Sequence, residues 1–321
     1  MKVSIALASF EGAATIEEQL DSFSRQTMLP DEVIVSDDRS RDNTVELVRN
    51  FAKLSGLNIK LIRNERNLGH IRNFSNALLN CTGDIVFLSD QDDKWFPEKI
   101  ETVTRVFLEN SACWAVIHDG MLTNSHLIPT GQTKIAQVRR GYGSAKNICT
   151  GALSAFRQDL LRYALPFPPS IAAHDAWLHS LAMMFPGRRV VLEQNLQYIR
   201  RHDANTSSWI VNSESPIRRF DVALAQAKES PADSYKDRLV MNKNLAKACD
   251  KMYNCFVDPT ALRALHTYQV RLELERRALH ARQSLINSNS FKRKILAFSM
   301  LLSGKYEHFN GLRSFARDIF R

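Results

Sequence analysis

Residues 83–99 read Gly-Asp-Ile-Val-Phe-Leu-Ser-Asp-Gln-Asp-Asp-Lys-Trp-Phe-Pro-Glu-Lys, and this stretch decides the fold. Its apolar run Ile85–Leu88 is typical of a strand buried on both faces of a parallel sheet. Pro97 and Glu98 stand where a helix is expected to begin. Three aspartates lie between the two elements, so the stretch predicts carboxylates at the carboxyl end of a buried strand.

The same alternation of strand and helix patterns repeats along the first part of the chain. Apolar, β-branched runs predict strands at 2–10, 32–36, 59–62, 114–124, 151–156 and 190–201. Amphipathic stretches predict helices at 14–25, 44–54, 71–80, 97–109 and 175–185. This order indicates an α/β fold with a mostly parallel sheet sandwiched by helices. Residues 126–150 are polar and predict a mobile loop.

After Trp209 the pattern becomes helical and strand signals are few. Residues 214–255 and 259–286 predict long helices, and 291–320 predict one or two short basic helices. We therefore predict a first domain over residues 1–210, with the mostly parallel sheet, and a helical, basic C-terminal region over residues 211–321.

Composition excludes several classes of protein. Of 321 residues, 44% are apolar and 24% are charged, which is typical of a globular chain. The uncharged apolar stretch Ile295–Ser303 is too short to span a bilayer, and Met1-Lys2 lead into a strand without a secretory signal. The five cysteines are odd in number and lack a Cys-x-x-Cys pair, which favours reduced thiols, a cytoplasmic location and no zinc site.

Positive charge is concentrated at the C-terminal end of the sequence. The net charge is +9, and residues 263–321 carry 12 Lys/Arg against 4 Asp/Glu. A basic tail on a nearly neutral body indicates an anionic partner, either a phospholipid surface or a nucleic acid. The alternative is an ordinary solvated helix face.

Polar side chains gather where the predicted strands end. Open parallel sheets bind ligands beyond the carboxyl ends of their strands. In this sequence the predicted strands end at Ala8–Gly12, Asp37–Ser40 and Ser89–Asp93. No dinucleotide-binding glycine motif and no P-loop occurs, which argues against NAD enzymes and P-loop NTPases. Asp90 and Asp92 are two residues apart in an extended segment and so point to one side, as a pair that suits Mg²⁺ or Mn²⁺. Taken alone, such aspartates equally serve turns and helix caps.

Three segments together resemble glycosyltransferase family 2. They are Pro-Asp-Glu-Val-Ile-Val-Ser-Asp-Asp-Arg-Ser-Arg-Asp-Asn-Thr at 30–44, Asn-Glu-Arg-Asn-Leu-Gly at 64–69 and the stretch 83–99, within a match over roughly residues 3–209. The last stretch is most similar to bacterial rhamnosyltransferase-like members. The resemblance implies a GT-A fold, a nucleotide-diphospho-sugar donor and Mn²⁺ or Mg²⁺ as cofactor.

The resemblance also implies roles for individual residues. The nucleotide-sugar would be bound by Ala8, Ser9, Phe10, Asp37, Asp38, Arg72, Asp90, Gly151 and Arg200. The metal would be bound by Asp92, the more direct ligand, with Asp90 and His202. Asp175 would be the general base, although an aspartate at a helix start also serves as an N-cap. Arg39 stands where the family usually has glycine, which puts in doubt how this loop surrounds the nucleotide. Arg201 alone is explained nearly as well as a solvated basic strand end.

The sequence thus predicts an inverting, metal-dependent glycosyltransferase that moves one sugar, such as rhamnose, from a UDP- or dTDP-sugar to a cell-surface glycan or polyprenyl-linked acceptor. Residues 290–321 would meet an anionic membrane surface, placing the protein peripherally on the inner face of the plasma membrane, with no nucleic acid as partner. One alternative is a sugar-1-phosphate nucleotidyltransferase, whose Gly-rich loop is missing at Ala8–Ala13. Another is a non-catalytic protein that binds nucleic acid through its basic tail.

Overall fold

The computed structural model describes residues 1–141, 148–201 and 231–320. The chain divides into two compact units, residues 1–168 with 173–228, and residues 229–321 with 169–172. The predicted domain boundary near residue 210 lies outside the described residues.

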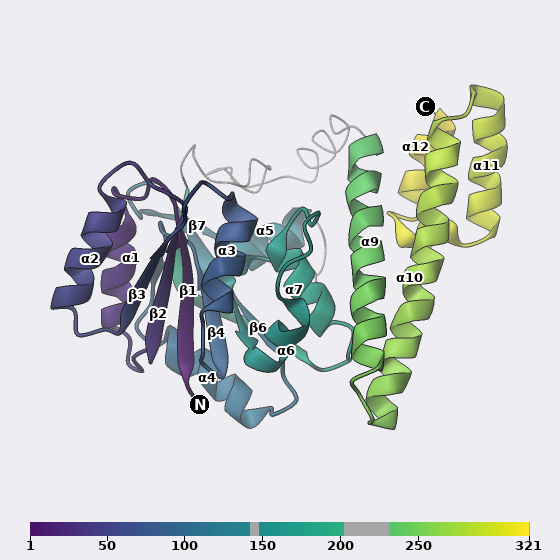
Figure 1. Cartoon of the computed structure of the whole chain (residues 1–321). Helices are drawn as coiled ribbons and strands as arrows, with labels where there is room; N and C mark the ends of the chain where they lie inside the picture. Colours follow the sequence, from purple (N-terminus) through teal and green to yellow (C-terminus); the bar gives the residue numbers. More distant parts are fainter. Residues whose placement is uncertain (142–147, 202–230, 321) are drawn as a thin grey trace. The chain divides into compact units, whose positions relative to one another are not determined.

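The first unit is built on one nine-stranded sheet (Figure 1). Its strands are β1 (Val3–Ser9), β2 (Glu32–Asp37), β3 (Ile59–Arg63), β4 (Ile85–Ser89), β5 (Lys94–Trp95), β6 (Ala115–Thr123), β7 (Pro129–Thr133), β8 (Ser154–Arg157) and β9 (Arg189–Arg200). The order is β3-β2-β1-β4-β8-β6-β9-β5, with β7 paired to β6. Strands β5, β7 and β8 run antiparallel to their neighbours, and the other strands share one direction.

Helices cover both sides of this sheet. They are α1 (Ile16–Ser24), α2 (Thr44–Leu54), α3 (His70–Leu79), α4 (Lys99–Glu109), α5 (Lys134–Gly141), α6 (Gln158–Ala164) and α7 (His174–Ala182). Alternate residues of β1 (Val3, Ile5 and Leu7) pack in one core with side chains of α1, α2 and α4. Helix α3 contacts β1 and β2, while its own buried Phe74 and Leu78 lie outside that core. The predicted helix–sheet–helix sandwich is confirmed.

Part of the predicted loop at 126–150 is regular secondary structure instead. Residues 129–141 form β7 and α5, and a 3-10 turn, Gly151–Leu153, follows the stretch. Residues 142–147 lie outside the described residues. Ile135 and Val138, three residues apart on α5, pack with Ile117 and Leu153 in a second small core. Two apolar positions in a polar stretch are too few to register as helical periodicity.

The second unit is helical, as predicted. It comprises α9 (Pro231–Tyr253), α10 (Pro259–Ile286), α11 (Ser290–Leu302), a 3-10 turn at Lys305–His308 and α12 (Leu312–Phe320). Asp258 caps α10 by accepting a hydrogen bond from the Ala261 N–H, and Asn289 caps α11 from the Lys292 N–H. No described helix is both long and apolar enough to cross a membrane. All five cysteines are free thiols, and Cys81, Cys113 and Cys249 are buried.

Candidate active site

The site lies where the strand order of the sheet reverses. The chain leaves β1 toward β2 on one side, whereas β4 pairs with β1 on the other. A crevice forms beyond the carboxyl ends of strands at such a switch point. Gln91, just after β4, accepts a hydrogen bond from the Phe10 N–H (2.8 Å) and donates one to the Phe10 carbonyl (2.9 Å). The ends of β1 and β4 are thereby joined.

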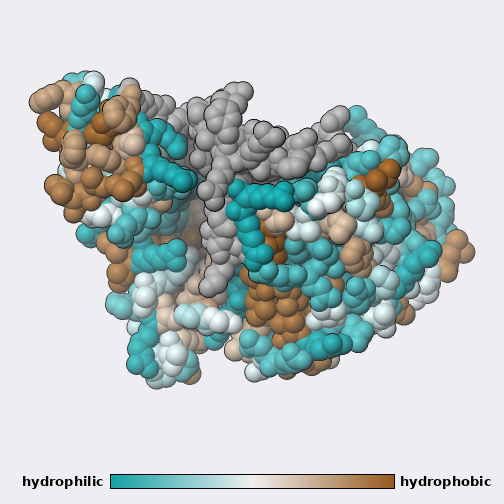
Figure 2. Space-filling view, turned by 180° about the vertical axis from the view of Figure 1, so that it is seen from behind, coloured by the Kyte–Doolittle hydropathy of each residue, from teal (hydrophilic) through white to brown (hydrophobic). Residues whose placement is uncertain are grey.

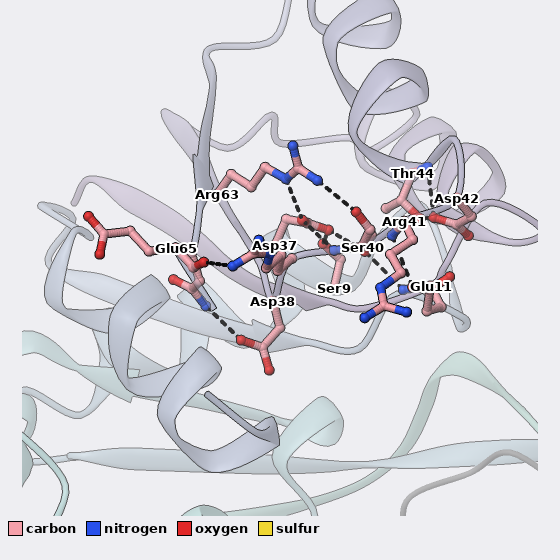
Figure 3. A network of polar contacts seen from close by, with 12 residues as sticks. Ser9, Glu11, Asp37, Asp38, Ser40, Arg41, Asp42, Thr44, Arg63 and Glu65 are labelled. Atoms are coloured by element: carbon pink, nitrogen blue, oxygen red, sulfur yellow. Dashed lines mark hydrogen bonds and ion pairs between the residues drawn. The ribbon is translucent and has the colours of Figure 1, made fainter. Parts of the chain in front are cut away.

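A network of hydrogen bonds fixes the loops after β1 and β2 to each other (Figure 3). The Glu11 N–H donates to Ser40 Oγ, and the Glu11 carboxylate accepts from the Arg41 N–H (both 2.9 Å). Asp42 accepts from the Ala13 N–H at 3.0 Å. Thr44 Oγ1 accepts from the Gly12 N–H at 2.8 Å. Side chains that hold backbone N–H groups in this way give the crevice a wall of fixed shape.

Asp37 and Asp38 lie in this wall with different surroundings. Asp37 is fully buried, accepts hydrogen bonds from Ser40 and Ser9, and lies 3.8 Å from the Arg63 guanidinium. Asp38 points away from that cluster in Figure 3. Its carboxylate accepts from the N–H groups of Leu68 (2.7 Å) and Gly69 (2.8 Å), at the start of α3. Asp37 and Asp38, both predicted to contact the nucleotide, thus accept hydrogen bonds within the protein and fix the loops after β2 and before α3.

The other residues predicted to contact the nucleotide lie at the same edge. Ser9 is buried and Ala8 nearly so, whereas Phe10 is 46% exposed beside them. Arg72 is exposed on the first turn of α3. Arg39 has a φ of +65°, in the left-handed region that favours glycine. Its backbone therefore keeps a glycine-like conformation, and its side chain donates to the Glu65 carbonyl.

Three carboxylates form the candidate metal site after β4. Asp90, Asp92 and Asp93 each offer an oxygen, and these oxygens lie within 4.8 Å of one another. Burial and then the charges of Asp92 and Asp93 raise the pKa of Asp90 well above its ordinary value. Burial and Asp92 raise the pKa of Asp93 to about 7. Hard oxygen ligands that repel one another fit a divalent cation, which would remove this repulsion.

The raised pKa values predict how a cation should affect stability. Because the folded protein holds protons on Asp90 and Asp93 more tightly than the unfolded chain, the contribution of these two groups to stability should fall as the pH rises from about 4 to about 7. A bound cation replaces those protons. The rise in melting temperature with Mn²⁺ should therefore be larger above pH 7 than well below it, as measured by scanning fluorimetry. An equal rise at both would contradict a site in this cluster.

Asp93 also anchors the cluster to β9. It accepts hydrogen bonds from Gln197 Nε2 (2.7 Å) and from the Arg200 N–H (3.1 Å). Strand β5 pairs with β9 at Lys94–Tyr198 and Trp95–Gln197, which brings the segment after β4 alongside β9. The fully buried Lys99 Nζ donates to Gln197 Oε1 and to the Ala152 carbonyl. Burial lowers the pKa of Lys99 well below its ordinary value.

Arg200 and Arg201 are both buried, but their surroundings differ. The Arg200 guanidinium donates to the carbonyls of Asp92 and Ser125 and pairs with Glu18, so it braces the metal loop. Arg201 is 8% exposed rather than solvated. Burial lowers the pKa of Arg201, and the negative charges of Asp93, Asp92 and Asp90 oppose this shift. His202, the third predicted metal ligand, lies outside the described residues.

Asp175 lies within electrostatic range of Asp90 in the acidic cluster. Its charge contributes to the raised pKa of Asp90. Helix α7 begins at His174 with Ala173 as its N-cap residue, so Asp175 lies inside the first turn rather than at the cap. Burial raises the pKa of Asp175, and the N–H groups of Ala176 and Gly151 and the charge of Lys134 oppose this rise. A carboxylate with a raised pKa is a stronger base once it has lost its proton.

Gly151 closely approaches His174, the residue before Asp175. A Cβ at this position would lie 2.8 Å from His174 Nε2. The His174 ring is buried and stacks on Phe74 with ring centroids 4.5 Å apart. Burial and the neighbouring His70 lower the pKa of His174 to about 3. Gly151 is therefore explained by packing against His174 and by its N–H near Asp175.

The substitution Gly151→Ala should destabilise the first unit by about 1–3 kcal/mol, because the methyl group overpacks the ring of His174. Thermal or denaturant unfolding measures the change. In a His174→Ala background the same substitution should cost much less, since the contact is gone. Equal costs in both backgrounds would show that another contact limits this position.

Lys134 and Lys99 were missed by the sequence analysis. Lys134 begins α5, and burial followed by the charge of Arg201 lowers its pKa to about 7, while Asp175 opposes the shift. Lys134 lies in the polar stretch interpreted as a loop, so no periodicity marked it. Lys99 ends the stretch 83–99, where nothing in the sequence pattern marks it as buried. The fold places Lys99 within electrostatic range of Asp90 and Asp93, and Lys134 within range of Asp175, which the sequence pattern alone does not indicate.

Comparison with known proteins identifies the family. Residues 4–163 match the model of glycosyl transferase family 2, and this part of the chain belongs to that family. The chain is 26% identical over 216 residues to an uncharacterized glycosyltransferase (alr2836) of Nostoc sp., covering 64% of this chain and 66% of that one. It is 30% identical over 126 residues to the UDP-Glc:alpha-D-GlcNAc-diphosphoundecaprenol beta-1,3-glucosyltransferase WfgD of Escherichia coli, covering 39% and 49%. A dTDP-rhamnosyl transferase of Shigella flexneri, RfbG, is 29% identical over 110 residues, covering 33% and 38%. The chain thus spans about a third to two thirds of these relatives.

Solved structures confirm the GT-A fold. Staphylococcus aureus TarS 1-349 in complex with UDP-GlcNAc superimposes with a TM-score of 0.60 at 20% identity, covering 99% of this chain and 82% of TarS 1-349. The mannosyltransferase PcManGT of Pyrobaculum calidifontis, in complex with GDP-Man and Mn²⁺, gives a TM-score of 0.50 at 19% identity, covering 98% and 79%.

Proposed function

We propose that the protein is an inverting, divalent-metal-dependent glycosyltransferase that moves one sugar from a UDP- or dTDP-sugar to a hydroxyl of a glycan or polyprenyl-linked acceptor. The observation that carries this proposal is the acidic cluster Asp90–Asp92–Asp93 at the switch point of the sheet, with Asp175 within electrostatic range of Asp90. The family match supports sugar transfer over the nucleotidyltransferase and nucleic-acid-binding alternatives.

The donor would lie across the ends of β1 and β4. Ala8, Ser9 and Phe10 would face its base and ribose, with Asp37 and Asp38 keeping the surrounding loops in shape. UDP, GDP and dTDP donors all occur in the names of the compared proteins. Rhamnose is one candidate sugar, because RfbG and the motif around Asp92 both point to it.

Asp90 and Asp92 would hold the cation, with Asp93 anchored behind them by Gln197. When bound, Mn²⁺ or Mg²⁺ would neutralise the charge that develops on the leaving diphosphate. Arg201 would supply a further positive charge on that side, because its guanidinium already lies close to the three carboxylates. Arg200 would keep the loop in place from behind.

Asp175 would accept the proton of the acceptor hydroxyl, whose oxygen attacks C1 of the sugar as the bond to the diphosphate breaks. This single displacement inverts the configuration at C1. The WfgD name includes a diphosphoundecaprenol acceptor, which supports a lipid-linked acceptor here.

A panel of nucleotide-sugars with Mn²⁺ tests the proposal by scanning fluorimetry. A true donor at about 100 times its dissociation constant should stabilise the protein by about 2.7 kcal/mol. Release of UDP or dTDP on addition of an acceptor then tests transfer itself. Failure of every nucleotide-sugar to stabilise the metal-loaded protein would overturn the proposal.

A further inference from the structure

Helix α11 has apolar side chains on two opposite sides. At about 100° per residue, Phe291, Ile295, Phe298 and Leu302 fall within a stripe about 60° wide, which we call the outer stripe. The buried Ala297 and Met300 project from the opposite side. They pack with Leu285 and Tyr306 in the core of the helical unit. The outer stripe is therefore not needed to build this core.

The outer stripe is exposed. Phe291 is 78%, Ile295 55%, Phe298 54% and Leu302 88% accessible. Figure 2 shows hydrophobic side chains gathered over the region of α11 and α12, at its upper left. Contiguous exposed apolar surface of this kind marks a site of interaction with another protein or with a membrane.

Helix α11, which carries the outer stripe, packs in a unit whose helices are joined by side-chain contacts. Arg282 of α10 forms a buried ion pair with Asp318 of α12 at 2.9 Å, and Tyr306 donates to the same carboxylate at 3.0 Å. Phe298 meets Phe315 of α12 edge to face, with ring centroids 5.2 Å apart. The stripe is thus presented on a fixed surface rather than on a loose tail.

Cations flank the outer stripe. Lys292 and Lys294 fall on either side of it at the start of α11, and both are exposed. Helix α11 contains no acidic residue, and residues 290–321 contain seven Lys/Arg against two Asp/Glu. One of those two acids is Asp318, which Arg282 already uses. Within the described residues, no carboxylate forms an ion pair with either lysine.

We propose that the outer stripe, with Lys292 and Lys294, docks the protein on the surface of an anionic lipid bilayer. The apolar side chains would enter the interface while the lysine stems extend to the lipid phosphates. A second copy of the chain fits less well. A two-fold interface would place the same cations near each other, and like charges oppose such pairing.

Co-sedimentation of the full chain with vesicles tests this surface. Binding to phosphatidylcholine–phosphatidylglycerol vesicles is expected at low salt, with little binding to phosphatidylcholine alone. Lys292→Gln/Lys294→Gln should weaken binding about 30-fold, since each cation near the surface contributes on the order of 1 kcal/mol. Phe291→Ser/Leu302→Ser should weaken it about tenfold or more. Deleting residues 290–321 is a poor test, because it removes the core residues Ala297 and Met300 and leaves Arg282 buried without its partner.

The matched control is Lys247→Gln/Lys251→Gln, which removes the same charge from exposed positions of α9 and should leave binding unchanged. All these variants should keep the wild-type melting temperature, because the changed side chains are exposed. Equal loss in the control would reduce the effect to net charge and overturn the proposal. So would a stripe variant that abolishes a dimer of the wild-type chain. No donor or acceptor is present in this assay, so its outcome is independent of the proposed enzymatic activity.

Discussion

Replacing Asp175 by asparagine is expected to lower the rate of sugar transfer by about 10²–10⁴-fold, the usual contribution of a general base. Asparagine keeps the shape of the side chain and can still accept the hydrogen bond from the Ala176 N–H. It cannot take a proton from the acceptor hydroxyl. Nucleotide release with saturating donor and Mn²⁺ measures the loss.

Stability separates this role from a structural one. Because burial raises the pKa of Asp175, its ionised form costs the folded protein free energy at neutral pH. The neutral Asp175→Asn variant should therefore melt at the wild-type temperature or above it, with donor binding unchanged. Asp159, in the first turn of α6, provides the matched control, and Asp159→Asn should keep full activity. Near-wild-type turnover in Asp175→Asn would return Asp175 to a helix-start role.

Removal of divalent cations is expected to abolish transfer, and Mn²⁺ or Mg²⁺ should restore it. Asp92→Asn should lower the rate by about 10²–10³-fold even with excess cation, in the range seen when one group that stabilises developing charge is lost. The variant also removes a negative charge that raises the pKa values of Asp90 and Asp93. The cation-free variant should thus be no less stable than the wild type.

The control for this prediction is Asp21→Asn, which removes a carboxylate from an exposed ion pair with Arg25 on α1. It should change neither the rate nor the rise in melting temperature with Mn²⁺. Turnover that survives chelation, or full activity in Asp92→Asn, would assign the three aspartates a purely structural role.

Periodicity predicted the main elements because buried parallel strands leave a strong local signal. The runs at Val3–Ser9 and Ile85–Ser89 are mostly apolar and buried along their whole length, and both are central strands. The two-residue strand β5 and the helix α5 leave no comparable signal. Strand β5 forms by pairing with β9, and α5 packs against β6. Tertiary contacts of this kind cannot be predicted from a short window of sequence.

The residues with chemistry were predicted as a set, but their individual surroundings were not. Arg200 and Arg201 are adjacent, and successive residues at the end of a strand point to opposite sides. Which of them faces the aspartates depends on the register between β6 and β9, which contains bulges near Asp119. Likewise, the burial of Lys99 follows from Gln197, almost a hundred residues later.

The interlocked loops after β1 and β2 have a consequence for redesign of the donor preference. Backbone N–H groups of Glu11, Gly12 and Ala13 are each held by a side chain from the other loop. A point substitution in one loop would break a hydrogen bond to the other loop, and the other loop would then lose its fixed shape. A change of nucleotide preference should therefore succeed when residues 10–13 and 38–44 are grafted together as one module, and fail when either is exchanged alone.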